Sequence, residues 1–348
     1  MTETNAHTTE SRPSFSDLAG TKPGEAQTSD PLRVYVASVF PDSVLNLFIE
    51  RFGAGANHTG RPLSSTELLA AAQGMNALVI TAPDHLDRAV VNQLPSSVRV
   101  IATYSVGTDH IDIEAVHARG IALFSTPDVL TESCADIAIL LMLGAARRVI
   151  EGVDLIRGGK WGGWSPCQLL GQDFHGRRLG ILGMGRIGRA VAVRARGFGM
   201  PVHYHNRHRL DPTLEAGATF HPQLNEMLEI SDFLCIACPS RPETRGMIDA
   251  RAIAHLPHGA IVANIARGDI IDDAALVEAL ESGAVAAAGL DVFAGEPDIH
   301  PAYRTMPNVF GLPHTGSSTL ETRLAMGRLL CDSLTAFQAG RSLPNRVC

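Results

Sequence analysis

The stretch LGILGMGRIGRA, residues 179–190, decides the fold. It places Gly183, Gly185 and Gly188 in G-x-G-x-x-G spacing, directly after an apolar run and at the start of a helical pattern. In this context the first glycine permits a tight turn, the second lets a pyrophosphate approach the backbone, and the third lets the helix pack on the strand. The stretch therefore predicts a dinucleotide site at a helix N-terminus. A purely structural turn is the alternative.

Short apolar runs alternate with helical patterns on both sides of this turn. Strands are predicted at 32–38, 77–81, 98–107, 121–126, 177–183, 201–205, 232–239, 259–266, 285–293 and 308–314. Helices are predicted at 42–53, 85–95, 132–150 and 319–339. Continuously apolar strands that alternate with helices are typical of parallel sheets covered on both faces. The sequence thus predicts an α/β protein with two doubly wound parallel sheets.

The composition excludes several other classes of protein. A net charge of -7 over 348 residues argues against general nucleic-acid binding. No uninterrupted apolar run reaches 18 residues, so no membrane span is expected. Residues 1–30 are rich in Thr, Ser, Pro and Glu, which predicts a disordered tail rather than a secretory signal.

Cysteine usage favours a cytoplasmic protein. Six cysteines in this length are too few for a disulfide scaffold. Cys235 and Cys238 form a CxxC, which raises a metal or redox alternative. A zinc site needs a second ligand pair at matching spacing, and we find none. The apolar surroundings, DFLCIACP, favour two reduced strand cysteines and no metal.

A basic cluster follows the second strand after the glycine turn. HYHNRHR, residues 203–209, has no carboxylate where dinucleotide folds usually place one against the adenine ribose. Asn206, Arg207 and Arg209 stand there instead, and arginine binds a 2′-phosphate through charge-assisted hydrogen bonds. The cluster therefore favours NADP over NAD, although NAD stays possible. A solvated basic loop is the alternative.

Three further strands end in NIARGDIID, GLDVFAGEP and GLPHTGSST. Together with the glycine turn, YSVGTDHID, TPDVLTESCADIA and CPSRPETRG, these motifs resemble the D-isomer-specific 2-hydroxyacid dehydrogenase family. The resemblance runs from about Pro31 to the C-terminus. GGWSPCQLLGQDFHGRRLGI and YHNR are most similar to the NADPH-dependent glyoxylate/hydroxypyruvate reductases in that family.

The family's catalytic residues fall on Arg267, Glu296 and His314. Their chemistry suits reduction of a 2-oxo acid, because a guanidinium holds a carboxylate in planar two-point geometry. Histidine titrates near neutral pH and serves as the general acid. Glu296 then fixes the tautomer of the imidazole. All three lie at carboxyl ends of predicted strands, where open α/β sheets bind ligands.

The resemblance also implies further contacts. It places Val106, Gly107, Arg267 and His314 at the substrate. It places the following residues at the cofactor: Thr131, Gly183, Gly185, Arg186, Ile187, Gly188, Asn206, Arg207, Arg209, Cys238, Pro239, Ile265, Ala266, Asp291, His314 and Gly316. One departure is Thr315, where an apolar residue usually follows the histidine.

The resemblance implies a split first domain, 31–129 with 314–348, and an inserted cofactor domain, 130–313. It implies a homodimer whose contact surface includes the predicted helix 132–150 and the connection after it. Trp161 and Trp164 in that connection either pack at a subunit interface or cap a substrate pocket. Another 2-hydroxyacid dehydrogenase, such as a phosphoglycerate-type enzyme, and a nucleotide-sensing corepressor are the alternative functions.

Overall fold

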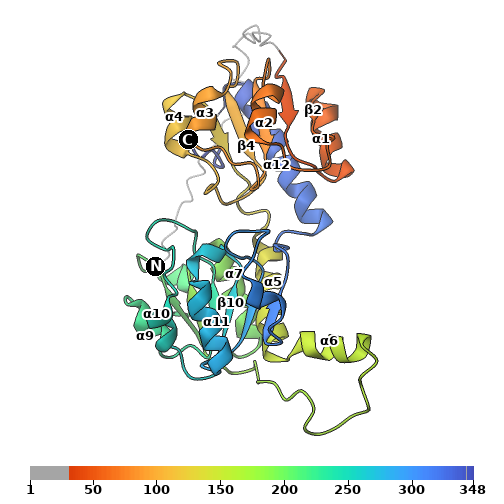
Figure 1. Cartoon of the computed structure of the whole chain (residues 1–348). Helices are drawn as coiled ribbons and strands as arrows, with labels where there is room; N and C mark the ends of the chain where they lie inside the picture. The colour runs from red at the N-terminus through yellow and green to blue at the C-terminus, as the bar shows by residue number, and fades with distance from the viewer. Residues whose placement is uncertain (1–30, 342) are drawn as a thin grey trace, which may run out of the picture. The chain divides into compact units, whose positions relative to one another are not determined.

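The first sheet of the protein is built from the N-terminal half of the chain. The computed structural model describes residues 31–341 and 343–348; the tail predicted for residues 1–30 lies outside them. The strand order is β2-β1-β3-β4-β5, and every pairing is parallel. The strands are β1 (Val34–Val36), β2 (Gly55–Ala56), β3 (Ala77–Ile80), β4 (Val100–Thr103) and β5 (Ala122–Phe124). Its helices are α1 (Asp42–Phe52), α2 (Ser65–Ala71), α3 (Arg88–Gln93), α4 (Ile113–Ala118) and the C-terminal α12 (Leu320–Gln338) (Figure 1).

The second sheet has the order β12-β11-β10-β9-β6-β7-β8, again with parallel pairings. Its strands are β6 (Leu179–Leu182), β7 (Val202–His205), β8 (Thr219–Phe220), β9 (Phe233–Ile236), β10 (Ala260–Asn264), β11 (Val285–Leu290) and β12 (Val309–Gly311). The helices around it are α5 (Thr131–Ala146), α6 (Val149–Arg157), α7 (Arg186–Gly197), α8 (Pro212–Glu215), α9 (Leu224–Leu228), α10 (Ala250–Ala254) and α11 (Asp273–Ser282). Two 3₁₀ turns, η1 (Gly268–Ile270) and η2 (Pro301–Arg304), complete it. The predicted fold class is confirmed.

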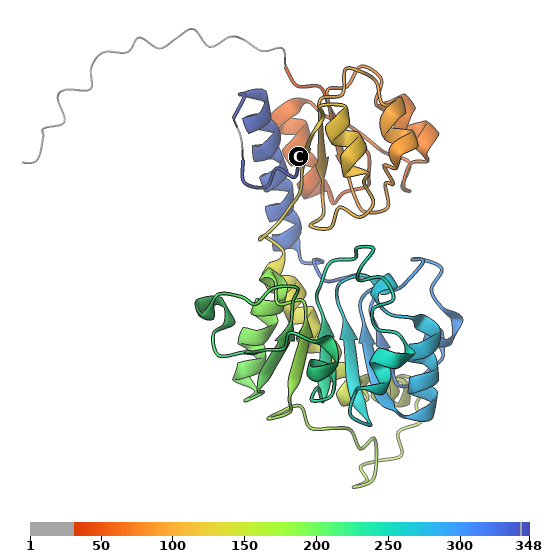
Figure 2. The same cartoon turned by 90° about the vertical axis from the view of Figure 1, so that its left-hand side faces the viewer.

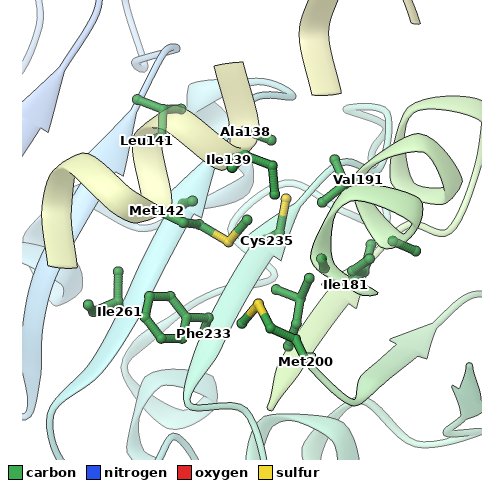
Figure 3. Close-up of a cluster of buried hydrophobic side chains, with 14 of the residues drawn as sticks. Ala138, Ile139, Leu141, Met142, Ile181, Val191, Met200, Phe233, Cys235 and Ile261 are labelled. Atoms are coloured by element: carbon green, nitrogen blue, oxygen red, sulfur yellow. The ribbon is translucent and has the colours of Figure 1, made fainter. Parts of the chain in front are cut away.

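Each sheet has a hydrophobic core on both faces, because neighbouring strand residues point to opposite sides. In the second sheet Ile261 packs toward α5 and α7, whereas the next residue, Val262, packs toward α9, α10 and α11. Figure 3 shows the first of these cores, with Met142 of α5 and Phe233 of β9 among its buried side chains. In the first sheet α1 and α12 cover one face, and α2, α3 and α4 cover the other (Figure 2). Burial on both faces explains why these strands are continuously apolar.

The helix predicted for 132–150 is wrong in extent. α5 ends at Ala146, Arg148 adopts a left-handed conformation with φ 54°, and α6 starts at Val149. The backbone N–H of Gln172 donates to the Ala146 carbonyl at 2.9 Å. The returning chain therefore satisfies a carbonyl that a continued helix would use itself. The apolar pattern alone contains no trace of this contact.

Candidate active site

The strand order brings the ends of β10, β11 and β12 side by side. Arg267 follows β10, Asp291 and Glu296 follow β11, and His314 follows β12. Because the three strands are parallel neighbours, their carboxyl ends lie at one edge of the sheet. The residues predicted as catalytic therefore converge from a stretch of chain that spans almost 50 positions.

Glu296 and His314 form a hydrogen-bonded pair. The Glu296 Oε2 and His314 Nδ1 atoms are 2.9 Å apart, and Oε1 accepts the backbone N–H of Phe293 at 2.8 Å. Burial raises the pKa of Glu296, but the bonds from His314 and Phe293 outweigh it, so this pKa lies below its usual value. An ionised carboxylate only accepts hydrogen bonds, so His314 donates from Nδ1. Its Nε2 is then the ring nitrogen that this pair does not use.

Arg267 is held by Asp109, from the loop between β4 and α4, and by the backbone of its own loop after β10. Its Nε donates to both carboxylate oxygens of Asp109 at 3.1 Å, and its Nη1 donates to the Ala266 carbonyl at 2.7 Å. Partial desolvation raises the pKa of the Asp109 carboxyl, yet the charge and the hydrogen bonds of Arg267 bring that pKa below the usual value. A guanidinium has five N–H groups, so donors on Nη1 and Nη2 remain for an anionic substrate.

Gly107 gives the Arg267 guanidinium its space. A Cβ atom at position 107 would lie 1.9 Å from Arg267 Nη2 and 2.8 Å from Asp109 Oδ1. No side chain fits there without displacing the guanidinium. The predicted substrate residues Gly107 and Arg267 are therefore direct neighbours, and Val106 beside them is 40% exposed.

Asp291 organises the backbone that presents His314. Its side chain accepts hydrogen bonds from the Thr315 and Gly316 backbone N–H groups, both at 2.7 Å, and from Thr315 Oγ1 at 3.1 Å. Burial raises the pKa of Asp291, and these bonds oppose that effect. The residue after the histidine thus adds a hydroxyl donor to this carboxylate. His314 itself has a left-handed φ of 54°.

The glycine turn has the shape that a dinucleotide requires. Gly183 has a φ of 99°, and a Cβ there would lie 2.4 Å from the Cys238 backbone nitrogen. A Cβ at Gly188 would lie 2.3 Å from the Gly183 carbonyl oxygen, whereas nothing lies within 4 Å of one at Gly185. The turn is therefore packed at its first and third glycines and open at its second, above the N-terminus of α7. These residues fit a pyrophosphate at that position.

The basic cluster after β7 is divided by its contacts. Asn206 Oδ1 accepts the Met184 backbone N–H at 2.7 Å, and this contact leaves the two N–H donors of its amide unused. Arg209 donates to Glu215 from Nε at 2.8 Å and from Nη2 at 3.0 Å. Arg207 is exposed and has no hydrogen-bond partner within residues 31–341 and 343–348.

The remaining predicted cofactor residues surround this turn or the catalytic edge. Cys238 and Pro239 follow β9 beside Gly183, and Ile265 and Ala266 follow β10. Thr131 begins α5 next to Asp128, whose carboxylate lies 2.6 Å from Arg186 Nε. Gly316 donates to Asp291, as described above.

Sequence reasoning missed three carboxylates: Asp109, Asp128 and Glu215. Asp109 and Asp128 lie inside the motifs YSVGTDHID and TPDVLTESCADIA, and this position was the available signal for both. The partners of the three carboxylates are Arg267, Arg186 and Arg209. The first two are distant in the sequence, and the third is brought to Glu215 by a loop whose conformation the sequence does not show.

The CxxC cysteines are both free and buried, and burial raises the pKa of each thiol. Among the described residues no group of three or more His, Cys, Asp or Glu side chains is arranged to hold a metal ion. None of the helices in the described part of the chain has the length and apolar character needed to cross a membrane.

Comparison with known proteins places this geometry in a family. The model of the D-isomer specific 2-hydroxyacid dehydrogenase NAD binding domain matches residues 139–316. The chain belongs to this family. The predicted family resemblance is thereby confirmed, and with it an oxidoreductase that acts on 2-hydroxy acids.

Relatives of this 2-hydroxyacid dehydrogenase cover nearly its whole length. Glycerate dehydrogenase of Hyphomicrobium methylovorum is 39% identical over 313 residues, which are 89% of this chain and 97% of the relative. Glyoxylate reductase of Pyrococcus furiosus is 38% identical over 320 residues, 90% of this chain and 95% of the relative. The NADPH-dependent glyoxylate/hydroxypyruvate reductase of Sinorhizobium meliloti, solved with NADP and malonate, is 32% identical with a TM-score of 0.83. That alignment covers 91% of this chain and 97% of the solved one.

Proposed function

We propose that this 2-hydroxyacid dehydrogenase reduces glyoxylate or hydroxypyruvate to the D-2-hydroxy acid with NADPH. The observation that carries the proposal is the Glu296–His314 pair at the sheet edge where Arg267 also lies. The Arg267 charge contributes to lowering the pKa of Glu296, which reflects this shared location. Reduction of a 2-oxo acid requires a cation to bind the substrate carboxylate and an acid to protonate the carbonyl oxygen.

Each side chain has a defined part in the proposed reaction. Arg267 binds the carboxylate of the 2-oxo acid through its unpaired N–H groups, and Gly107 leaves the space for it. A bound nicotinamide would supply the hydride. His314 donates a proton from Nε2 to the carbonyl oxygen of the substrate, while Glu296 holds Nδ1–H and stabilises the imidazolium before the transfer.

Asn206 and Arg207 support the NADPH part of the proposal. No carboxylate occupies the end of β7, where it would repel a 2′-phosphate. Asn206 offers an amide donor, and Arg207 offers an unpaired guanidinium. The Sinorhizobium meliloti relative, which is described as NADPH-dependent, was solved with NADP, and this supports the same cofactor here. Free thiols agree with the proposed cytoplasmic location.

The names of the relatives support small substrates. Glyoxylate reductase acts on the smallest 2-oxo acid with an aldehyde carbonyl, and glycerate is the alcohol that hydroxypyruvate reduction gives. We therefore place both acids ahead of a phosphoglycerate-type substrate.

We further propose the domain limits 31–129 with 314–348 and 130–313. We also propose a homodimer formed through α5, α6 and the loop after α6. This region exposes large apolar side chains: Leu140, Val149, Val153, Ile156, Trp161, Trp164 and Leu170. A cavity of about 650 Å³ lies at its base, lined by Arg148, Leu170 and Phe310 among others. Several exposed large apolar side chains in one region are typical of subunit contacts. It favours an interface role for the two tryptophans, of which Trp164 is 83% exposed.

The test is oxidation of NADPH in the presence of glyoxylate, hydroxypyruvate and a panel of larger 2-oxo acids. His314→Ala should lower kcat by about 10²–10⁴, as expected for loss of a general acid. His258→Ala, which changes a histidine outside the proposed site, is the control. Near-normal turnover by folded His314→Ala would remove the acid from the proposal.

A further inference from the structure

A buried carboxylate lies directly behind the proposed 2′-phosphate site. Glu215 ends α8, and its side chain is only 7% exposed. It accepts a hydrogen bond from the Tyr204 hydroxyl at 2.6 Å and two from Arg209, at 2.8 and 3.0 Å. These bonds keep the pKa of Glu215 below its usual value, with Arg209 as the largest contribution and Tyr204 as the second.

The same contacts close the loop between β7 and α8. The hydroxyl of Tyr204, a residue of β7, also accepts the Leu210 backbone N–H at 3.0 Å. Tyr204 is fully buried, and Asp211 caps α8 through the Thr213 backbone N–H at 2.9 Å. Asn206 fixes the start of the loop to the glycine turn, as described above. Both ends of residues 206–211 are therefore anchored, and Arg207 lies between the anchors.

The charges in this loop are not equivalent. Arg209 has its positive charge neutralised by Glu215, so it attracts a phosphate less than a free guanidinium does. Arg207 has no such partner among the described residues. The buried Glu215 carboxylate therefore uses its charge on the anchor residue Arg209 and leaves Arg207 as the unpaired cation of the loop.

We propose that Glu215, with Arg209 and Tyr204, is a positioning residue for dinucleotide choice: it fixes the loop so that Arg207 meets the 2′-phosphate. This inference rests on the proposed use of NADPH. It changes the expected role of Arg209 from a phosphate ligand to an anchor. Glu215 acts through the loop and does not touch the cofactor.

The test compares Glu215→Gln with the wild type in two measurements. The first is the KM for NADPH and for NADH in reduction of glyoxylate. The second is the affinity for 2′,5′-ADP and for 5′-AMP by calorimetry, which needs no turnover. Glutamine keeps the size of the side chain but removes the charge. Glu226→Gln, an exposed acid of α9 without a partner in the described chain, is the matched control.

We expect Glu215→Gln to raise the KM for NADPH and to weaken 2′,5′-ADP binding, each about fivefold. A loosened loop weakens the contact of Arg207 with the 2′-phosphate, and a loss of about fivefold is smaller than the loss of a whole charge-assisted hydrogen bond. NADH and 5′-AMP should change less than about twofold, since they lack the 2′-phosphate. Arg209→Gln should give the same pattern, and the double variant should be no worse than either single one, because all act through one contact. If Glu215→Gln fails to fold, Tyr204→Phe replaces it, because it removes another hydrogen bond of the same anchor and should give the same pattern.

Three results would overturn the inference. Tighter 2′,5′-ADP binding by Glu215→Gln would show that the carboxylate only competes with the phosphate. Equal losses for NADPH and NADH would show a general structural role. Unchanged NADPH binding by Glu215→Gln beside a large loss by Arg209→Gln would make Arg209 a direct ligand. A wild type without NADPH preference would instead refute the proposed function, and the inference with it.

Discussion

Replacing Gly107 by alanine tests whether the guanidinium of Arg267 must stay where the structure places it. The added Cβ would lie 1.9 Å from Nη2 and 2.9 Å from Cζ of Arg267, far inside contact distance. The guanidinium of Arg267 is the mobile end of a long side chain. We therefore expect the guanidinium to move and the fold to survive. The φ at Gly107 is not in the left-handed region, so alanine adds no backbone strain there.

The size of the effect follows from this displacement. Relief of the overlap requires a shift of about 1 Å, and a misplacement of that size costs about 10²-fold in rate. We therefore expect kcat/KM for glyoxylate to fall about 10²-fold, which corresponds to about 2.7 kcal/mol of transition-state stabilisation. The Asp109–Arg267 pair would be disturbed as well, because the same Cβ lies 2.8 Å from Asp109 Oδ1.

The assay is steady-state NADPH oxidation over a range of glyoxylate concentrations, with thermal melting to confirm folding. Gly197→Ala at the end of α7 is the control, because nothing lies within 4 Å of a Cβ there. It should keep wild-type activity. If folded Gly107→Ala keeps kcat/KM within about twofold, Arg267 does not bind substrate in the described geometry.

Three further predictions follow from the site and the surface. Arg207→Ala should raise the KM for NADPH about tenfold at low salt and less at high salt, and it should leave the KM for NADH nearly unchanged. Asn206→Asp should raise the KM for NADPH further, because its carboxylate repels the 2′-phosphate. Equal use of both cofactors by the wild type would contradict both expectations. Glu296→Gln should be less stable than the wild type to urea at pH 7, because the folded pKa of Glu296 lies below its usual value and the carboxylate gains stability from its hydrogen bonds. The difference should disappear as the pH falls through that folded pKa, and a constant difference from pH 7 to acid would refute the assignment of an ionised Glu296. Sedimentation at micromolar concentration should show a dimer, and a monomeric mass would exclude the proposed interface.

The sequence by itself determined the strands and the glycine turn, and it predicted where Arg267, Glu296 and His314 lie relative to the strands. Strands buried on both faces are apolar throughout, and the glycines of the turn are required by contacts within one strand–turn–helix unit. Arg267, Glu296 and His314 each sit just after an identifiable strand, so the parallel order alone predicts that they meet. The glycine turn depends on contacts between residues close in the sequence, and the strands recur along the chain in a regular alternation with helices.

Only the tertiary structure decided which groups neutralise the functional cations. Asp109 and Arg267 are 158 positions apart in the chain, and their pairing depends on the end of β4 facing the end of β10. Glu215 reaches Arg209 because α8 turns back onto β7, and α5 ends at Ala146 because Gln172 returns to its last carbonyl. A charged or polar side chain looks the same in the sequence whether it is solvated or paired. Its role is fixed by the partner that the folded chain brings to it, since desolvation makes that partner necessary.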